Sequence, residues 1–322
     1  LLRGSFGAVQ PCGRLALESG PDDAVHNTAT LARLAFPAAF VRRVERDEAS
    51  DIAGVALPRG GLWLPACAAV SPAHAIADWL GRGGGAIRFV GGARVATLAR
   101  DPSSGDWIAR DSAGRAIAAA PVVVLANAGD AVRLAAVESL AVRRVRGQTT
   151  CLRDPLLAGL RTVLGGDAYA VPTGSDGRIL VGASFDEGDS LAPDPRDDLG
   201  NLRRLGRMLD RDPQAMLPGA IPAAVGFRFA LPDRLPAVGP LPDEVAARAA
   251  ADALLRSDKL PIPLAPGLYG AFAFGSRGLL WAALAAELLP AIVCGEPAPI
   301  ERELVAAVSP SRLLRRRLRR AR

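Results

Sequence analysis

The chain has 322 residues, carries a formal net charge of +6, and is half hydrophobic, which is enough apolar material for one large domain or two interleaved ones. Its four cysteines are far apart and it has only two histidines, so a disulfide framework, a zinc site and a Ser-His-Asp triad are all poorly supported. We therefore expect no metal, no membrane span and a reducing, cytoplasmic setting. The first residues lack a Met and a secretory signal, and suggest a chain that is entered part-way through.

The first part of the chain is predicted to alternate short strands with helices. Residues 7–18 have the pattern of a strand, and 22–46 have a helical pattern that is broken at Pro37. Two short extended pieces are predicted within 54–70, around a Gly-Gly pair. The helix predicted over 72–80 begins with a Ser-Pro cap.

The middle of the chain favours antiparallel strands with one exception. A strand pair is predicted over 86–100 and a hairpin over 107–119. The run at 121–125 is apolar and mostly β-branched, which is typical of a central parallel strand. It ends in Ala-Asn-Ala-Gly, and small residues at the carboxyl end of such a strand suit the crevice where open α/β sheets bind ligands.

Five further segments follow this strand. The sequence predicts a basic extended segment at 140–150, a hairpin at 164–184, a helix from 195 to about 210, and two strands joined by a Pro-Asp turn at 225–239. An Ala-rich insertion occupies 241–260.

The segment 267–295 has the clearest ligand-binding pattern. An apolar run of strand length, 268–274, leads through Gly-Ser-Arg-Gly at 275–278 into an apolar helix at 279–293 with a glycine stop. A unit of this kind directs backbone N–H groups and the positive helix end at an anion, and its glycines let a flat ligand approach. An ordinary strand-turn-helix packing unit explains the pattern about equally well.

Positive charge gathers in two places. The first is the extended segment 140–150, and the second follows a Pro-rich connector at 296–300, where seven of the last eleven residues are arginine. Arginine clusters can neutralise phosphates, although a solvated charged tail is an equally good explanation of the second cluster.

Several motifs occur in order over nearly the whole chain. They are GGL (60–62), VVVLANAG (122–129), VRGQ (145–148), GDAYAVP (166–172), VGAS (181–184), GFRFALPDRLPAVG (226–239), FGSRGL (274–279) and SPSRLLRRRL (309–318). Together they resemble the flavin-dependent amine oxidases related to D-amino-acid oxidase and glycine oxidase. The GSRGL turn and the basic end resemble more closely the C-terminal oxidase half of the bacterial bifunctional enzymes that modify the wobble uridine of tRNA.

The resemblance implies an α/β fold with interleaved α+β segments: an FAD-binding doubly wound sheet and a mostly antiparallel substrate domain. It assigns 1–60 and 138–232 to the substrate domain, 61–137 and 233–300 to the FAD domain, and 301–322 to a basic tail. No G-x-G-x-x-G precedes a helix in this sequence, so we expect the sheet to lack its first βαβ unit. The chain then corresponds to an N-terminally truncated oxidase module.

The resemblance also implies a reaction. With FAD as cofactor, the enzyme removes the carboxymethyl group from 5-carboxymethylaminomethyl-(2-thio)uridine in tRNA and leaves 5-aminomethyl-(2-thio)uridine. It implies that Arg228 binds the substrate carboxylate, that Tyr169 belongs to the substrate pocket, and that Arg277 lies beside the flavin. Arg228 could instead be a strand arginine paired with Asp233, and Tyr169 a core tyrosine.

The remaining implied contacts are with the cofactor and the RNA. The expected FAD contacts are Arg94, Val95, Ala126, Gly129, Gly275, Ser276, Arg277, Gly278 and Leu279. The expected contacts with the anticodon stem-loop are Arg143, Arg144, Arg146, Arg312, Arg315, Arg316 and Arg317. A methyltransferase half is expected in the same chain or in a partner chain.

Two other functions stay open at the level of sequence. One is a free glycine, sarcosine or D-amino-acid oxidase, which would turn over its substrate without RNA. The other is an inactive RNA-binding remnant that cannot hold flavin and would be colourless.

Overall fold

The structure is a computed structural model that describes residues 9–174, 177–257 and 260–320. Contacts between residues divide the chain into two compact units. Unit 1 comprises Leu1–Phe89 and Arg146–Gly226, and unit 2 comprises Val90–Val145 and Phe227–Arg322. Each unit therefore combines two separate segments of the chain. Which unit serves the substrate and which the FAD stays a prediction.

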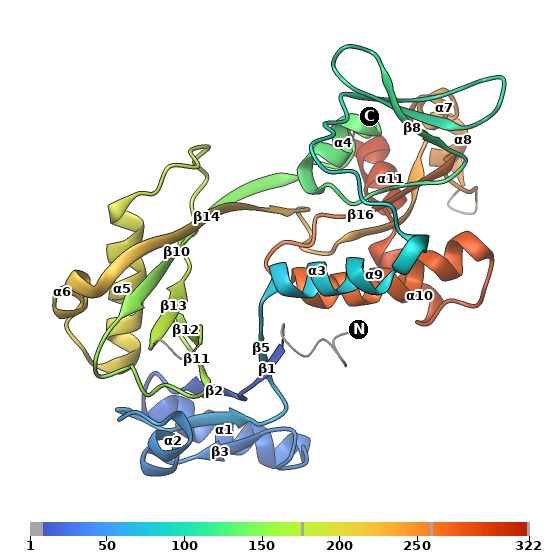
Figure 1. The fold of residues 1–322 in the computed structure, drawn as a ribbon. Helices are drawn as coiled ribbons and strands as arrows, with labels where there is room; N and C mark the ends of the chain where they lie inside the picture. Colours follow the sequence, from blue (N-terminus) through green and yellow to red (C-terminus); the bar gives the residue numbers. More distant parts are fainter. Residues whose placement is uncertain (1–8, 175–176, 258–259, 321–322) are drawn as a thin grey trace. The chain divides into compact units, whose positions relative to one another are not determined.

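Unit 1 is built on an eight-stranded sheet (Figure 1). The strands, in spatial order, are β14 (Ala220–Ala230), β10 (Arg143–Arg153), β13 (Arg178–Gly182), β12 (Tyr169–Pro172), β11 (Val163–Gly165), β2 (Arg14–Leu17), β4 (Gly61–Leu64) and β3 (Arg42–Val44). Strands β2 and β11 run parallel, whereas the other neighbours with a defined register are antiparallel. Along the chain, β10 and β14 each extend past the boundary of unit 1 by a few residues.

Among the described residues, unit 1 contains the helices α1 (Pro21–Leu34), α2 (Arg46–Ala53), α3 (Pro72–Arg82), α5 (Pro195–Leu209) and α6 (Pro213–Met216), with short 3-10 turns at Gly84–Ala86 and Leu217–Gly219. Residues of α2, α5 and α6 pack with the apolar side chains of the sheet in one core. A two-stranded sheet pairs β1 (Val9–Pro11) with β5 (Ala68–Val70). Helix α5 begins where the carboxylate of Asp194 accepts a hydrogen bond from the Arg196 N–H, and its Leu202 and Leu205 are fully buried against the sheet.

Unit 2 contains two three-stranded sheets. One is a meander of β6 (Thr97–Arg100), β7 (Trp107–Arg110) and β8 (Ala116–Ala120). The other has the order β15 (Ala237–Pro242), β16 (Leu264–Phe272) and β9 (Val123–Leu125), in which β16 is antiparallel to β15 and parallel to β9. This second sheet positions the candidate site.

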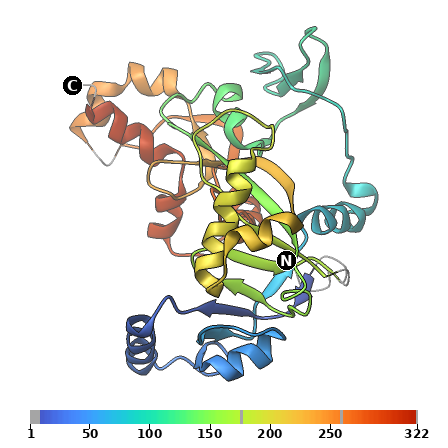
Figure 2. The same ribbon diagram turned by 90° about the vertical axis from the view of Figure 1, so that its left-hand side faces the viewer.

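Seven helical segments occur among the residues of unit 2 that the structure describes. They are a 3-10 turn at Ala128–Asp130, α4 (Ala131–Leu134), α7 (Glu244–Ala249), α8 (Ala251–Arg256), α9 (Gly278–Cys294), α10 (Arg302–Val308) and α11 (Ser311–Arg320). Because strand side chains alternate, Leu268 and Phe272 of β16 enter one core, whereas Tyr269 and Ala271 pack with residues of α9. Helix α11 contacts α8, and Figure 2 shows the two side by side.

Many predicted elements are confirmed, including α5, the β7–β8 hairpin, and the strand-turn-helix unit of β16 and α9. The helix predicted over 22–46 is wrong beyond Leu34. Ala35 adopts a left-handed conformation that ends α1, and residues 42–44 become β3 because they pair with β4. Pairing across a sheet has overridden a local helical pattern.

Other differences concern strand pairing. The strand predicted over 7–18 is split at Gly13, and residues 7–8 lie outside the described part. Of the pair predicted over 86–100, only β6 forms a strand, because its partner is β7 rather than 86–90. Strand β9 is parallel as predicted but lies at an edge among the described strands, and Val122 and Val124 are 41% and 43% exposed.

Candidate functional site

Strands β9 and β16 end at the same edge of their sheet. Their parallel register pairs Leu268 with Val123 and Gly270 with Leu125, so the segments after the two strands, 126–129 and 273–278, leave the sheet together. A non-glycine residue with positive φ follows each strand, Ala128 at 55° and Ala273 at 61°. Such strained backbone is concentrated at ligand sites, and the carboxyl edge of parallel strands is where open α/β sheets bind ligands.

The turn after β16 leads into a helix start that lacks a side-chain cap. Arg277 is the N-cap residue of α9 and makes no capping hydrogen bond with its side chain. Space is open at Gly278, where an added Cβ would meet no heavy atom within 4 Å, and Leu279 is exposed. The first N–H groups of a 17-residue helix therefore face a region that an anionic, flat group could occupy.

The strand that carries Arg228 is hydrogen-bonded to this turn. The Gly275 N–H donates to the Phe229 carbonyl at 2.8 Å, and Ala230 bridges to Phe274 in antiparallel fashion. Gly275 itself has φ of +57°, which glycine adopts without steric cost. The backbone beside half-buried Arg228 is thus fixed against the glycine turn within unit 2.

Gly129 and Phe229 tie the end of β9 to the same strand. A Cβ at Gly129 would overlap the Phe229 ring, so the absence of a side chain at 129 lets the ring pack there. Because neighbouring side chains on a strand point to opposite faces, Arg228 points away from the face that Phe229 occupies. Ala126, the first residue after β9, is exposed.

The segment that contains Arg94 and Val95 is hydrogen-bonded to α4, the helix that follows β9 in the chain. Arg133 of α4 donates to the Ala96 carbonyl at 2.6 Å and to the Val95 carbonyl at 3.4 Å, and it also pairs with Asp130 at 2.7 Å. Its guanidinium hydrogen bond lowers the pKa of Asp130 below the ordinary value. The two expected adenine contacts therefore belong to the same unit as Ala126 and Gly129, and the Arg94 side chain is exposed.

Tyr169 belongs to unit 1, whereas Arg228 and the glycine turn belong to unit 2. Its surroundings are therefore those of unit 1 alone. It is half-buried on β12 and pairs in register with Gly182 of β13. A Cβ at Gly182 would come within 2.5 Å of the Tyr169 hydroxyl, so the glycine makes room for the ring. Its role toward a substrate stays a prediction.

Arg146 is engaged inside unit 1. It is 3% exposed, forms an ion pair with Asp197, and donates to the carbonyls of Ser190 and Ala192 at 2.6 and 2.7 Å. It also donates to Gln148 at 3.2 Å. These bonds fasten the 184–194 loop and the start of α5 to β10, and they leave no exposed guanidinium for RNA. Arg146 is therefore not a candidate for contact with RNA.

The tail arginines divide into internal and external groups. Arg312 is largely buried and pairs with Asp233, and Arg315 donates to the carbonyls of Leu254 and Ser257. Arg316 and Arg317 are exposed, as is Arg143. Arg144 lies 4.7 Å from the centre of the Phe227 ring in a cation–π contact. The basic tail is thus a packed helix that presents only part of its charge to solvent.

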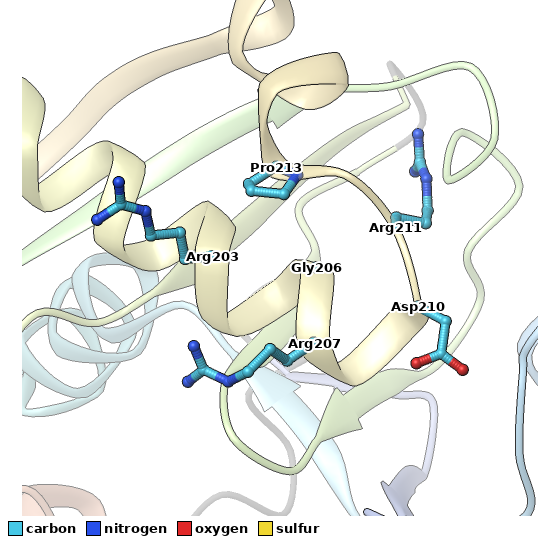
Figure 3. Close-up of a pocket in the computed structure, with 6 residues that line it drawn as sticks. All are labelled: Arg203, Gly206, Arg207, Asp210, Arg211 and Pro213. Atoms are coloured by element: carbon cyan, nitrogen blue, oxygen red, sulfur yellow. The ribbon is translucent and has the colours of Figure 1, made fainter.

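One hollow in unit 1 is lined by arginines but does not converge on a ligand. It has a volume of about 330 Å³ at the end of α5 (Figure 3). The charged groups of Arg203, Arg207, Arg211 and Asp210 radiate outward in Figure 3, and the last three are paired with Asp167, Asp154 and Arg59. In the part of the chain that the structure describes, no group of three or more His, Cys, Asp or Glu could hold a metal ion.

Comparison with known proteins places this geometry in a family. The FAD dependent oxidoreductase family matches residues 4–291 of the chain. The chain belongs to this family of FAD-dependent oxidoreductases. The family resemblance inferred from the motifs, the α/β fold of the D-amino-acid oxidase type, and FAD as the family's cofactor are thereby confirmed.

Relatives in the family refine the likeness. The tRNA 5-methylaminomethyl-2-thiouridine biosynthesis bifunctional protein MnmC of Cupriavidus necator is 40% identical over 316 residues, covering 96% of this chain and 48% of the relative. The protein of the same name from Burkholderia vietnamiensis is 43% identical over 316 residues, covering 95% and 47%. The chain therefore spans about half the length of these relatives.

Two solved structures share the fold of this chain. Glycine oxidase from Geobacillus kaustophilus superimposes with a TM-score of 0.72 at 22% identity, covering 97% of this chain and 78% of that one. L-proline dehydrogenase from P. horikoshii gives 0.72 at 14% identity, covering 98% and 80%. Among the described residues, no helix is both long and apolar enough to cross a bilayer.

The residues at the start of α9 fit a flavin. The open space at Gly278 and the uncapped helix start suit a flat group that accumulates negative charge. Phe229 and Ser139 were not singled out from the sequence. The alternating aromatic residues in GFRF were a signal for the first, whereas nothing local marks Ser139.

Proposed function

We propose that this chain acts as an FAD-dependent oxidase module that removes the carboxymethyl group from 5-carboxymethylaminomethyl-(2-thio)uridine at the tRNA wobble position. The product is 5-aminomethyl-(2-thio)uridine. The observation that supports this most directly is the hydrogen-bonded placement of the Arg228 strand against the glycine turn before α9. The names of the relatives supply the tRNA substrate.

FAD, held by the residues at the start of α9 and the end of β9, would supply the two-electron oxidation of the carboxymethyl C–N bond as hydride acceptor. Water would then hydrolyse the C=N bond of the substrate, and the two carbons would leave as glyoxylate. The residues of the chain orient the substrate and tune charge. Arg228 holds the substrate carboxylate, because a planar guanidinium can donate two parallel hydrogen bonds to it. Carboxylate binding places the neighbouring carbon toward the site and rejects amines that lack the acid group.

The start of α9 has the second role. Its uncapped N–H groups and the Arg277 charge stabilise negative charge that develops next to the turn. Ser276, Gly275, Gly278 and Leu279 supply backbone contacts there, and Ala126 and Gly129 contact the cofactor from the end of β9. Arg94 and Val95 serve the adenine end, and Tyr169 contributes its hydroxyl to the substrate.

Exposed arginines hold the tRNA by neutralising its phosphates. The wobble base must also flip out of the base stack to reach the flavin site. Arg143, Arg144, Arg316 and Arg317 are the candidates for contact with the anticodon stem-loop. The relatives are described as bifunctional, and the methyltransferase activity is expected in the same chain or in a partner. Action on tRNA fits a cytoplasmic protein.

The test combines colour and turnover. The purified chain is scanned for the absorbance of oxidised flavin near ~450 nm, and is then incubated separately with tRNA that carries the carboxymethylaminomethyl base and with free sarcosine. Loss of the carboxymethyl group from tRNA, measured by mass spectrometry of nucleosides, supports the proposal. Turnover of sarcosine alone would indicate a free amino-acid oxidase, and a colourless, inactive protein would indicate a remnant.

A further inference from the structure

A pocket of about 460 Å³ lies within unit 2 between α11 and the turn that precedes β10. We call it the α11 pocket. Its walls are formed by Glu138, Ser139, Ala141, Pro232, Asp233, Leu313, Arg316 and Arg317. The two elements are held together where Arg317 donates to the Glu138 carbonyl. Ala141 belongs to the basic segment 140–150 and Arg316 and Arg317 belong to the basic tail, so both segments contribute to the wall.

Arginines outside the pocket pair with both carboxylates in the wall. Asp233 accepts from Arg312 at 2.9 and 3.0 Å, and Glu138 shares Arg248 with Glu244, at 3.1 and 3.0 Å. Burial alone would raise the pKa of Asp233, but the hydrogen bonds and charge of Arg312 lower it below the ordinary value. Counted together, the four arginines Arg248, Arg312, Arg316 and Arg317 exceed the three carboxylates of Glu138, Asp233 and Glu244 by one positive charge.

The remaining charge belongs to Arg316 and Arg317. The Arg316 side chain is 64% exposed, and its distance to the Asp233 carboxylate is 3.8 Å, too long for a hydrogen bond. Arg317 uses one nitrogen on the Glu138 carbonyl and is otherwise exposed. The pocket thus has a surplus of positive charge on adjacent residues of one helix.

A buried hydroxyl in the wall has no partner. Ser139 is 6% exposed, and its Oγ makes no hydrogen bond among the described residues, although its backbone N–H donates to Glu244 at 2.6 Å. A buried polar atom without a partner is costly and calls for an explanation. Because Ser139 lines the pocket, its hydroxyl is a candidate donor to an anion bound there.

We infer that the α11 pocket binds a phosphodiester of the RNA backbone, with Arg316 and Arg317 as the cations and Ser139 as a neutral donor. The inference rests on the proposed tRNA substrate. Arginine side chains and serine hydroxyls are the usual protein contacts to phosphate oxygens, and such contacts fix the position of the RNA without reading its sequence. Arg312 and Arg315 only hold α11 in place.

The test measures the affinity of the full chain for a labelled anticodon stem-loop RNA between about 50 and 200 mM KCl. The variants are Arg316→Ala, the double variant Arg316→Ala/Arg317→Ala, and Ser139→Ala. The matched control is Arg115→Ala, an exposed arginine in the same unit. The single Arg316 change keeps the bond between Arg317 and Glu138, so it is informative even if the double variant is unstable.

The double variant is expected to bind about tenfold or more weakly and to lower the slope of log K against log salt by about 0.7–0.9, since the neutralisation of one phosphate is lost. Arg316→Ala should lower it by about half as much. Ser139→Ala should weaken binding by about threefold with no change in slope, because a hydroxyl carries no charge. The control should match the unchanged protein.

Unchanged affinity and slope in Arg316→Ala would overturn the inference while leaving the proposed function intact. A second arm titrates inorganic phosphate at constant ionic strength. If phosphate binding needs Arg316 and RNA binding does not, the pocket serves a free phosphate, and the inference is overturned. If the unchanged chain binds no RNA at all, both the proposed tRNA substrate and this inference are wrong.

Discussion

In unit 1, the polar groups along β10 find partners inside the protein, whereas in unit 2 the carboxyl edge of β9 and β16 keeps backbone donors that no side chain caps. Thr150 donates to Asp198 at 2.6 Å, and Asn201 donates to the Gln148 carbonyl and to Thr150. At the other region, α9 starts without a side-chain cap.

The difference separates structural polarity from polarity available to a ligand. A satisfied cluster contributes to a unique packing of loop, helix and sheet, and has no donor left to offer. Uncapped helix N–H groups beside left-handed alanines cost stability in the free protein, and a ligand that accepts their hydrogen bonds regains it. Four substitutions test whether the two regions differ in this way.

The largest effect is expected for Arg146→Met in the satisfied cluster. It leaves the Asp197 carboxylate and the carbonyls of Ser190 and Ala192 without their donor, which should lower the free energy of unfolding by about 3–5 kcal/mol. Chemical denaturation measures it. Arg196→Ala is the control, because its side chain is 91% exposed and should matter by less than about 0.5 kcal/mol. Equal, small losses in both would show that the cluster is not needed.

Asp233→Asn should lower stability by about 3 kcal/mol near neutral pH, because it leaves Arg312 without its ion-pair partner. The folded-state pKa of Asp233 is lowered, so its carboxylate stabilises the fold above the unfolded value of about 3.9, and this contribution is lost as pH falls through the folded pKa. The difference in melting temperature between the two proteins should therefore shrink below about pH 4. A gap that stays constant down to about pH 2 would refute this.

Gly129 and Gly278 form a matched pair at the open edge. Gly129→Ala should cost about 1–3 kcal/mol of stability, because the new methyl group overlaps the Phe229 ring. Gly278→Ala has room and should change stability by less than about 1 kcal/mol. If a flavin lies over this turn, Gly278→Ala should nevertheless weaken FAD binding, measured by flavin fluorescence quenching. Unchanged FAD affinity would place the flavin elsewhere.

The elements that the sequence predicted well carry their signals locally. Helix α5 has an aspartate cap and a Pro at its start, and α9 follows a glycine turn and ends at Gly295. Strand β3 was missed because its short segment has helical periodicity and becomes a strand only by pairing with β4, which is distant in sequence. Short strands of this kind depend on tertiary partners.

The candidate site was predictable only in part, because some of its contacts also join residues that are distant in the sequence. The glycine turn was visible as a pattern, but its hydrogen bond to Phe229 joins residues about forty-five positions apart and has no local signature. The tail arginines looked equivalent in the sequence. They differ in the structure because Arg315 donates to a carbonyl of α8 and Arg312 pairs with the carboxylate of Asp233. Arg316 and Arg317 are exposed to solvent instead.

The most direct test of the account is the activity of Arg228→Leu toward tRNA that carries the carboxymethylaminomethyl base. We expect kcat/KM to fall by about 100-fold or more, because the substrate carboxylate loses its bidentate partner, while the flavin absorbance is unchanged. Arg228→Lys should recover only part of the loss, since an ammonium cannot form the same fork. Full activity of Arg228→Leu with flavin bound would contradict the assignment of the carboxylate to this strand.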